Sequence, residues 1–224
     1  MFQNDYIMRM IFQMGVFLLN LKNRLKEEKY EDSLIEIDKL IKELSGMDPH
    51  TFNGLDYQNV SNIIGRQGAI DWAKCIFISE ALREKGHVYE LLNNEDESFY
   101  YYLKSLNYVL YLVNNCDNFE VNNYVKSVDL SYSKIKDYVI PFETKKMLIE
   151  YLKIRGKYAE AENMIYELLS EGNQEDYTII RDKGIKFYES ILNVPEDNLI
   201  IGGLPKEEVI EGLENLKSTM RTNS

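Results

Sequence analysis

The sequence predicts an all-α fold built from antiparallel helical hairpins, and three observations predict it. Apolar residues recur at helical spacing along most of the 224 residues. Glycine (12) and proline (4), which interrupt helices, are scarce. A short turn phrase that ends in a small residue lies between amphipathic stretches, as GKYAEA at 156–161 and in blurred forms at 28–33 and 93–98.

The first helix is expected over 4–26 and carries two apolar stripes. The first stripe comprises Ile7, Ile11, Met14, Leu18, Leu21 and Leu25, and the second comprises Met8, Phe12 and Leu19. Two stripes indicate burial on two sides, by the rest of the chain or by a second subunit. The apolar run is shorter than the ~20 residues of a membrane span and contains Arg9, Gln13 and Asn20, so neither a span nor a signal peptide is expected.

The middle of the chain predicts further helices in order. A helix over 30–44 should end at Ser45-Gly46, because Asp48-Pro49 prevents its continuation. The stretch 50–68 is the least regular and suggests short helices, with Gly65 and Gly68 bracketing a turn. A long helix over 69–92 and a second over 95–113 follow.

The remaining segments predict a poorer helix or pair of helices over 118–138 and the clearest hairpin, 143–155 with 158–169. One more helix is expected over 175–192. The stretch 195–205 is expected to be a linker, and Pro205 to begin a last helix that ends near Met220. No strand-like alternation and no domain linker interrupt the pattern, so one domain over 1–224 is expected.

The turn phrases are spaced like a helical repeat. Tyr30, Glu95 and Tyr158 are separated by 65 and 63 residues, each close to twice the ~34 residues of a tetratricopeptide unit. Gly156 stands at the turn and Ala161 at the close helix crossing, so this hairpin resembles the tetratricopeptide family. The matching residues of the other hairpins are Tyr30, Ser33, Ile37, Leu40, Gly86, Tyr89, Ser98, Tyr102 and Ser105. The resemblance implies a right-handed α-α superhelix, although the first two turns lack glycine.

A second resemblance covers nearly the whole chain. The opening FQNDYIMRMI at 2–11 and the closing GGLPKEEV at 202–209 resemble the two ends of a bacterial protein family of unknown function, found mainly in Firmicutes. The resemblance implies a tetratricopeptide-like helical fold and supplies no catalytic residues.

Composition excludes several classes of function. A net charge of -11 disfavours nucleic acid and anionic membranes as partners. The cysteines, Cys75 and Cys116, are expected to be reduced and buried, which fits a cytoplasmic protein.

Local signatures of chemistry are absent from the sequence. His50 and His87 lack partners at metal-ligand spacing, and no phosphate loop or nucleophile elbow occurs. We therefore expect no cofactor, no metal and no enzyme, although a carboxylate pair assembled in space would leave no local signature.

The leading hypothesis is a non-catalytic scaffold for protein–protein interaction, with a neutral or basic partner held on the concave face of the superhelix. The candidate partner-binding residues are Arg83, Tyr89, Tyr101 and Lys153. Within the run 100–102, Tyr102 should be core, and Tyr100 or Tyr101 partly exposed. Two alternatives are a structural homodimer through the first helix and a small-molecule sensor or enzyme with a pocket inside the superhelix.

Overall fold

In the computed structural model, helices occupy most of the described residues, which are 2–65, 69–115, 125–171 and 174–218. This part of the chain contains no strand, so the all-α prediction is confirmed there. Contacts divide the chain into a first unit, Met1–Val139, and a second unit, Ile140–Ser224. Each unit is described by itself, and both the single domain and the superhelix stay predictions.

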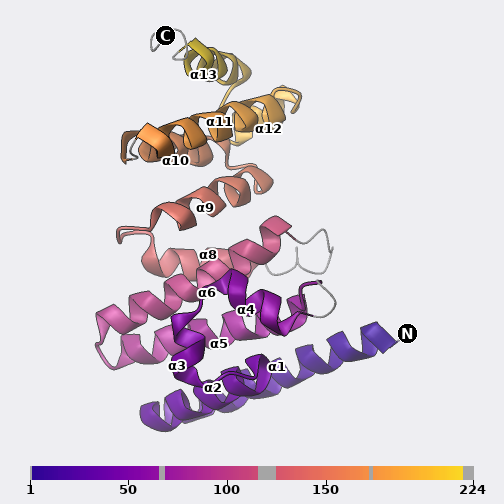
Figure 1. Cartoon of the computed structure of the whole chain (residues 1–224), viewed down its shortest axis with the longest axis vertical. Coiled ribbons are helices and arrows are strands. Elements are labelled where there is room, and N and C mark those ends of the chain that lie inside the picture. The colour runs from indigo at the N-terminus through magenta and orange to yellow at the C-terminus, as the bar shows by residue number, and fades with distance from the viewer. Residues whose placement is uncertain (1, 66–68, 116–124, 172–173, 219–224) are drawn as a thin grey trace. The chain divides into compact units, whose positions relative to one another are not determined.

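The first unit contains seven described helices, which Figure 1 labels in chain order. They are α1 (Phe2–Lys26), α2 (Tyr30–Ser45), α3 (Pro49–Gly54), α4 (Tyr57–Ile64), α5 (Trp72–Leu91), α6 (Glu95–Asn115) and α8 (Val125–Ile135). The second unit contains α9 (Phe142–Ile154), α10 (Tyr158–Glu171), α11 (Gln174–Ile191), α12 (Glu196–Ile201) and α13 (Lys206–Ser218).

Four helix ends close with the same turn geometry. Glu28, Asn93, Gly156 and Gly203 each adopt a left-handed conformation, with φ between 56° and 76°. In each turn this residue donates its amide to the carbonyl three residues back, and the next residue donates to the carbonyl five residues back. These two bonds satisfy carbonyls that a helix end leaves without partners. Glutamate and asparagine therefore hold the conformation that glycine holds in the later turns.

The core of the first unit lies around α5 and α6, which pack side by side (Figure 1). Three serines mark the crossing of α5, α6 and α8. Ser79 Oγ donates to the Ser105 carbonyl at 3.0 Å, Ser105 Oγ donates to the Ser79 carbonyl at 2.8 Å, and Ser131 Oγ lies 3.1 Å from Ser105 Oγ. Such small side chains let helices approach closely, and their hydroxyls satisfy one another in the apolar interior.

In the second unit, α10 packs against α9 and α11, and α11 packs against α13. Close approach requires glycine at Gly212, because a Cβ there would lie 2.3 Å from the Tyr188 ring. Lys145 is 5% exposed, and its ammonium donates to the carboxylates of Glu167 and Glu171 on α10. This unit is therefore held by both close packing and paired charges.

Several predicted elements need correction. The long helix expected from residue 69 begins at Trp72, because the Asp71 side chain accepts a hydrogen bond from the Lys74 amide and caps it. The expected linker over 195–205 contains α12, whose first turn is acidic and whose Leu199 is fully buried. Of the helix expected over 118–138, the structure describes α8, and residues 116–124, with Cys116, lie outside the described residues.

The prediction that the first helix is buried on two sides is wrong for the chain alone. Ile7, Met10 and Leu21 are buried against the first unit, whereas Phe12 is 73% and Met8 65% exposed. The second apolar stripe of α1 therefore has no cover within the described residues of the chain.

Candidate functional site: the Lys104 cleft

Two short helices form one wall of the candidate site. The Asp48 carboxylate caps α3 by accepting hydrogen bonds from the amides of His50 and Thr51, and Pro49 occupies the first helical position. The Asp56 carboxylate caps α4 by accepting from the Asn59 amide at 2.7 Å. The irregular stretch after residue 50 is thus two capped helices, and α4 packs against α6.

Lys104, on α6, ties α3 to the core. Its ammonium donates to the Phe52 carbonyl at 2.9 Å, the Asn53 carbonyl at 3.0 Å and the Tyr100 hydroxyl at 3.3 Å. The two carbonyls belong to the last turn of α3, where a cation is favourable. The residue is 8% exposed, and its ammonium also lies 4.8 Å from the centre of the Phe52 ring.

Burial disfavours the charged form of Lys104. Burial, with a smaller contribution from the nearby Lys85 ammonium, lowers the pKa of Lys104 to about 8, and Asp56 opposes this shift. Among the described residues Lys104 forms no ion pair, and its three protons meet three neutral acceptors. The geometry suits a fixed donor that holds a helix end.

Asn53 forms hydrogen bonds with two tyrosines. The Tyr100 hydroxyl donates to the Asn53 carbonyl at 3.0 Å, and the Asn53 side-chain amide donates to the Tyr101 hydroxyl at 3.2 Å. Tyr101 in turn stacks on Tyr89 of α5, with ring centres 5.5 Å apart. Burial raises the pKa of Tyr101 to about 12, so its hydroxyl remains neutral.

The Lys104 cleft opens beside these contacts and has a volume of about 300 Å³. Its lining combines aromatic, aliphatic and amide groups from α3, α4, α6 and the connection between α3 and α4. The lining residues are Asn53, Gly54, Leu55, Asp56, Tyr57, Tyr100, Leu103, Lys104 and Asn107. An apolar wall with a few polar groups is typical of a binding site.

A second cleft of about 290 Å³ surrounds Glu90. The Glu90 carboxylate accepts hydrogen bonds from Lys134 Nζ at 2.8 Å and from the Tyr102 hydroxyl at 2.7 Å. Burial alone would raise the pKa of Glu90, but hydrogen bonds from Lys134, Tyr102 and His87 lower it to about 2. The carboxylate is therefore ionised and saturated with donors, which suits a structural tie between α5, α6 and α8.

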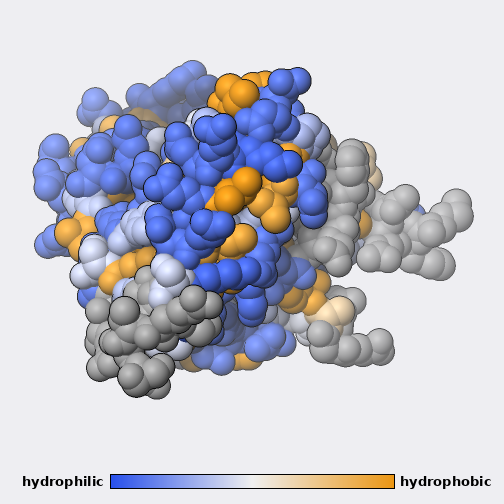
Figure 2. Space-filling view, turned by 90° about the horizontal axis from the view of Figure 1, so that it is seen from above, coloured by the Kyte–Doolittle hydropathy of each residue, from blue (hydrophilic) through white to orange (hydrophobic). Residues whose placement is uncertain are grey.

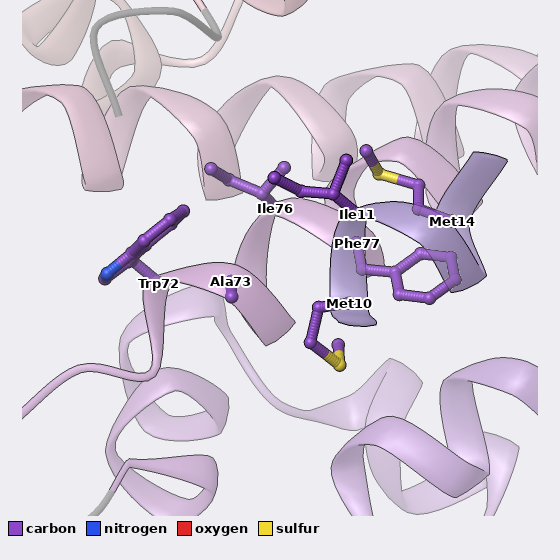
Figure 3. Close-up of a pocket in the computed structure, with 7 residues that line it drawn as sticks. All are labelled: Met10, Ile11, Met14, Trp72, Ala73, Ile76 and Phe77. Atoms are coloured by element: carbon purple, nitrogen blue, oxygen red, sulfur yellow. The ribbon is translucent and has the colours of Figure 1, made fainter. Parts of the chain in front are cut away.

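A third cavity lies between α1 and α5 (Figure 3). Its volume is about 10 Å³, which is room for one water molecule at most. It is lined by Met10, Ile11, Met14, Trp72, Ala73, Ile76 and Phe77. The cavity is a packing defect between two helices and does not hold a ligand.

The four candidate partner-binding residues have different environments in the structure. Tyr101 is 4% exposed, so it is a core residue and not a surface contact, while Tyr100 is 38% exposed. Arg83 is paired with Glu80 at 2.7 Å. Tyr89 is half-buried in the stack with Tyr101.

Lys153 lies on α9 in the second unit and is paired with Glu150 at 2.7 Å. Partner binding by Arg83, Tyr89 and Lys153 stays a prediction. The sequence analysis missed Lys104, for which the one local signal is its position four residues after Tyr100, on the same face of a helix.

The expectations about metal sites and cysteines can be compared with the structure only over the described residues. No group of three or more histidine, cysteine, aspartate or glutamate side chains with metal-binding geometry occurs in the described residues. Cys75 is buried, and its Sγ lies 3.6 Å from the Ser61 hydroxyl. His87 is half-buried, and its Nδ1 lies 3.4 Å from the Glu90 carboxylate.

Charged and polar residues dominate the face that Figure 2 shows, with apolar residues in separate patches. None of the helices in the described ranges combines the length and apolar character that crossing a membrane requires.

Comparison with known proteins identifies a family. A search of curated proteins and a search of solved structures found no match. The model of the family of unknown function DUF6483 matches residues 1–221, so the chain belongs to this family. The sequence prediction of a family of unknown function over nearly the whole chain is thereby confirmed, whereas its bacterial distribution and its tetratricopeptide-like repeats stay predictions.

Proposed function

We propose that this member of a family of unknown function is a non-catalytic helical scaffold that binds a segment of a partner protein in the Lys104 cleft. The observation that carries the proposal is the lining of the cleft. Tyr57 and Tyr100 offer aromatic surface, Leu103 offers aliphatic surface, and Asn53 and Asn107 carry amide groups that match a peptide backbone.

The absence of catalysis is part of the proposal and is supported by the contacts that three charged groups make. Lys104 donates all three protons to fixed acceptors, and Lys85 is paired with Asp38. Glu90 accepts from Lys134 and Tyr102. Groups in such arrangements hold helices together, whereas an acid or base in a reaction must exchange its proton with a substrate.

Charge favours a neutral or basic partner segment. The protein carries a net charge of -11, and Asp56 is exposed at the rim of the cleft. Lys104 is turned away to the end of α3, so it gives little attraction to an acidic segment. An apolar or aromatic anchor flanked by lysine or arginine fits this lining.

The tetratricopeptide-like organisation belongs to the same proposal. Glu28, Asn93 and Gly156 share one turn geometry and are 65 and 63 residues apart, which supports a repeated hairpin. In such repeats, stacked hairpins present an extended surface to a partner. The cytoplasmic location expected from the reduced cysteines is likewise proposed.

A site-specific crosslinking experiment tests the proposal. A photo-crosslinking amino acid at position 103, in the cleft, should capture the partner from extract of the native cells, and the same group at position 130, exposed on α8, should not. Leu103→Arg should abolish capture by the tagged protein, whereas the matched Leu130→Arg should retain it. Equal capture at both positions, or capture that survives Leu103→Arg, would contradict the proposal. A small molecule retained in native mass spectrometry and lost only in Leu103→Arg would favour the sensor alternative instead.

A further inference from the structure

Helix α1 has two faces with opposite environments. Its inner face packs against α2 and α5 and includes Ile7, Met10 and Leu21, which are at most 8% exposed. Its outer face is apolar but open to solvent. The exposed members and their exposed fractions are Met8 65%, Ile11 41%, Phe12 73%, Val16 43% and Leu19 61%. A contiguous apolar stripe of this kind marks an interaction surface.

A glycine lies at the centre of this outer face. A Cβ at Gly15 would meet nothing within 4 Å, so no close contact inside the chain requires glycine there. Glycine in the middle of a helix is destabilising relative to alanine. A second helix that crosses the outer face at this point would give a reason for the glycine, because the missing side chain lets the two backbones approach.

Two residues of the outer face, Phe12 and Leu19, lie at equal distances in sequence from this centre. Phe12 lies three residues before Gly15, and Leu19 lies three residues after Val16. Two antiparallel copies of α1 that cross at Gly15 and Val16 therefore bring Phe12 of each copy against Leu19 of the other. This reciprocal contact is the requirement of a two-fold symmetric interface.

The charges at the two ends of α1 favour one direction of the pairing. On the same exposed face, Asp5 lies ten residues before Gly15, and Lys26 lies ten residues after Val16. An antiparallel pair places each Asp5 beside the Lys26 of the other copy. A parallel pair would place Asp5 beside Asp5 and Lys26 beside Lys26, which is repulsive. We propose that the outer face of α1 binds the α1 of a second copy of this chain, in antiparallel orientation.

The area of the outer face of α1 can be compared with the area that stable complexes bury. Twenty-five residues at 1.5 Å each give a helix about 37 Å long, and a contact strip about 10 Å wide covers roughly 400 Å². This is about half of the ~800 Å² per partner that stable complexes bury. We therefore expect a weak dimer, which forms at high local concentration.

Sedimentation velocity of the whole chain between about 5 and about 500 µM tests the dimer. The wild type should shift from monomer to dimer across this range. Phe12→Glu should remain monomeric, while Ile35→Glu, a control at a 67% exposed position on α2, should behave as the wild type. Circular dichroism checks that both variants keep their helix content. A wild type that stays monomeric at the highest concentration, or a Phe12→Glu variant that still dimerises, would overturn the proposal.

Engineered cysteines test the orientation. Val16→Cys, next to the two-fold axis, should crosslink the dimer under mild oxidation, whereas Asp5→Cys should not, because in the antiparallel pair the two copies of position 5 lie at opposite ends. The wild type, with its own cysteines, gives the background. Crosslinking of Asp5→Cys as fast as Val16→Cys would show a parallel pair and refute the assignment. Asp5→Lys should weaken the dimer about tenfold, and adding Lys26→Asp should restore it.

Discussion

Replacing Tyr108 by phenylalanine should make the first unit more stable, although tyrosine is larger and is fully buried there. The Tyr108 ring packs against Phe52, with ring centres 6.2 Å apart and planes nearly parallel. Its hydroxyl has no hydrogen-bond partner among the described residues. A buried hydroxyl without a partner has lost its hydration and gained nothing in return.

The expected change in the free energy of unfolding has two contributions. Removing the unpartnered hydroxyl relieves a desolvation cost of about 1–3 kcal/mol. The void of about 10 Å³ that the oxygen leaves costs about 0.2 kcal/mol at 24 cal/mol per Å³. The net expectation is a free energy of unfolding higher by about 1 kcal/mol or more, equivalent to a rise in melting temperature of roughly 2–4 °C.

Trp72 provides the assay, because it is the only tryptophan of the chain and lies in the first unit. Its fluorescence during urea unfolding therefore reports the unit that contains Tyr108. The matched control is Tyr102→Phe, which removes a hydroxyl that donates to Glu90 at 2.7 Å and should lose about 1 kcal/mol. If Tyr108→Phe were less stable than the wild type by 0.5 kcal/mol or more, the hydroxyl would have a partner and the reasoning would fail.

Three further predictions concern turns, packing and charge. Glu28→Gly should raise the free energy of unfolding by about 0.5–1 kcal/mol in urea titration, because glycine adopts a φ of 57° without strain. Gly212→Ala should lower the melting temperature by several degrees in circular dichroism, since its Cβ would overlap the Tyr188 ring at a cost of about 1–3 kcal/mol. The pKa of Glu90 is lowered to about 2, so the unfolded chain binds more protons there, and stability should fall as pH falls from about 5 to about 2. Glu90→Gln leaves Lys134 without its carboxylate, so the stability of this variant should depend less on pH between about 5 and about 2. If its pH dependence equalled that of the wild type, the lowered pKa of Glu90 would not be the cause.

Local features of the sequence predicted the helices well. They did not predict contacts between residues that are far apart in the sequence. The hairpin turns at Gly156 and Glu28 depend on hydrogen bonds between residues three and five apart, so a short phrase reveals them. Lys104 takes its role from carbonyls 51 and 52 residues earlier in the chain, and no spacing rule connects them. Tyr101 was misplaced on the surface for the same reason, because its stacking partner Tyr89 lies on another helix.

The shared geometry of the four turns has a consequence for the order of folding. A turn closed by bonds across three and five residues needs no long loop to be closed first, so each helix pair can form early and fast. The contact between Lys134 and Glu90 joins residues 44 apart and can form only after α8 has docked on the pair of α5 and α6. Changes in the turns should therefore act mainly on the rate of folding, and changes at this contact mainly on the rate of unfolding.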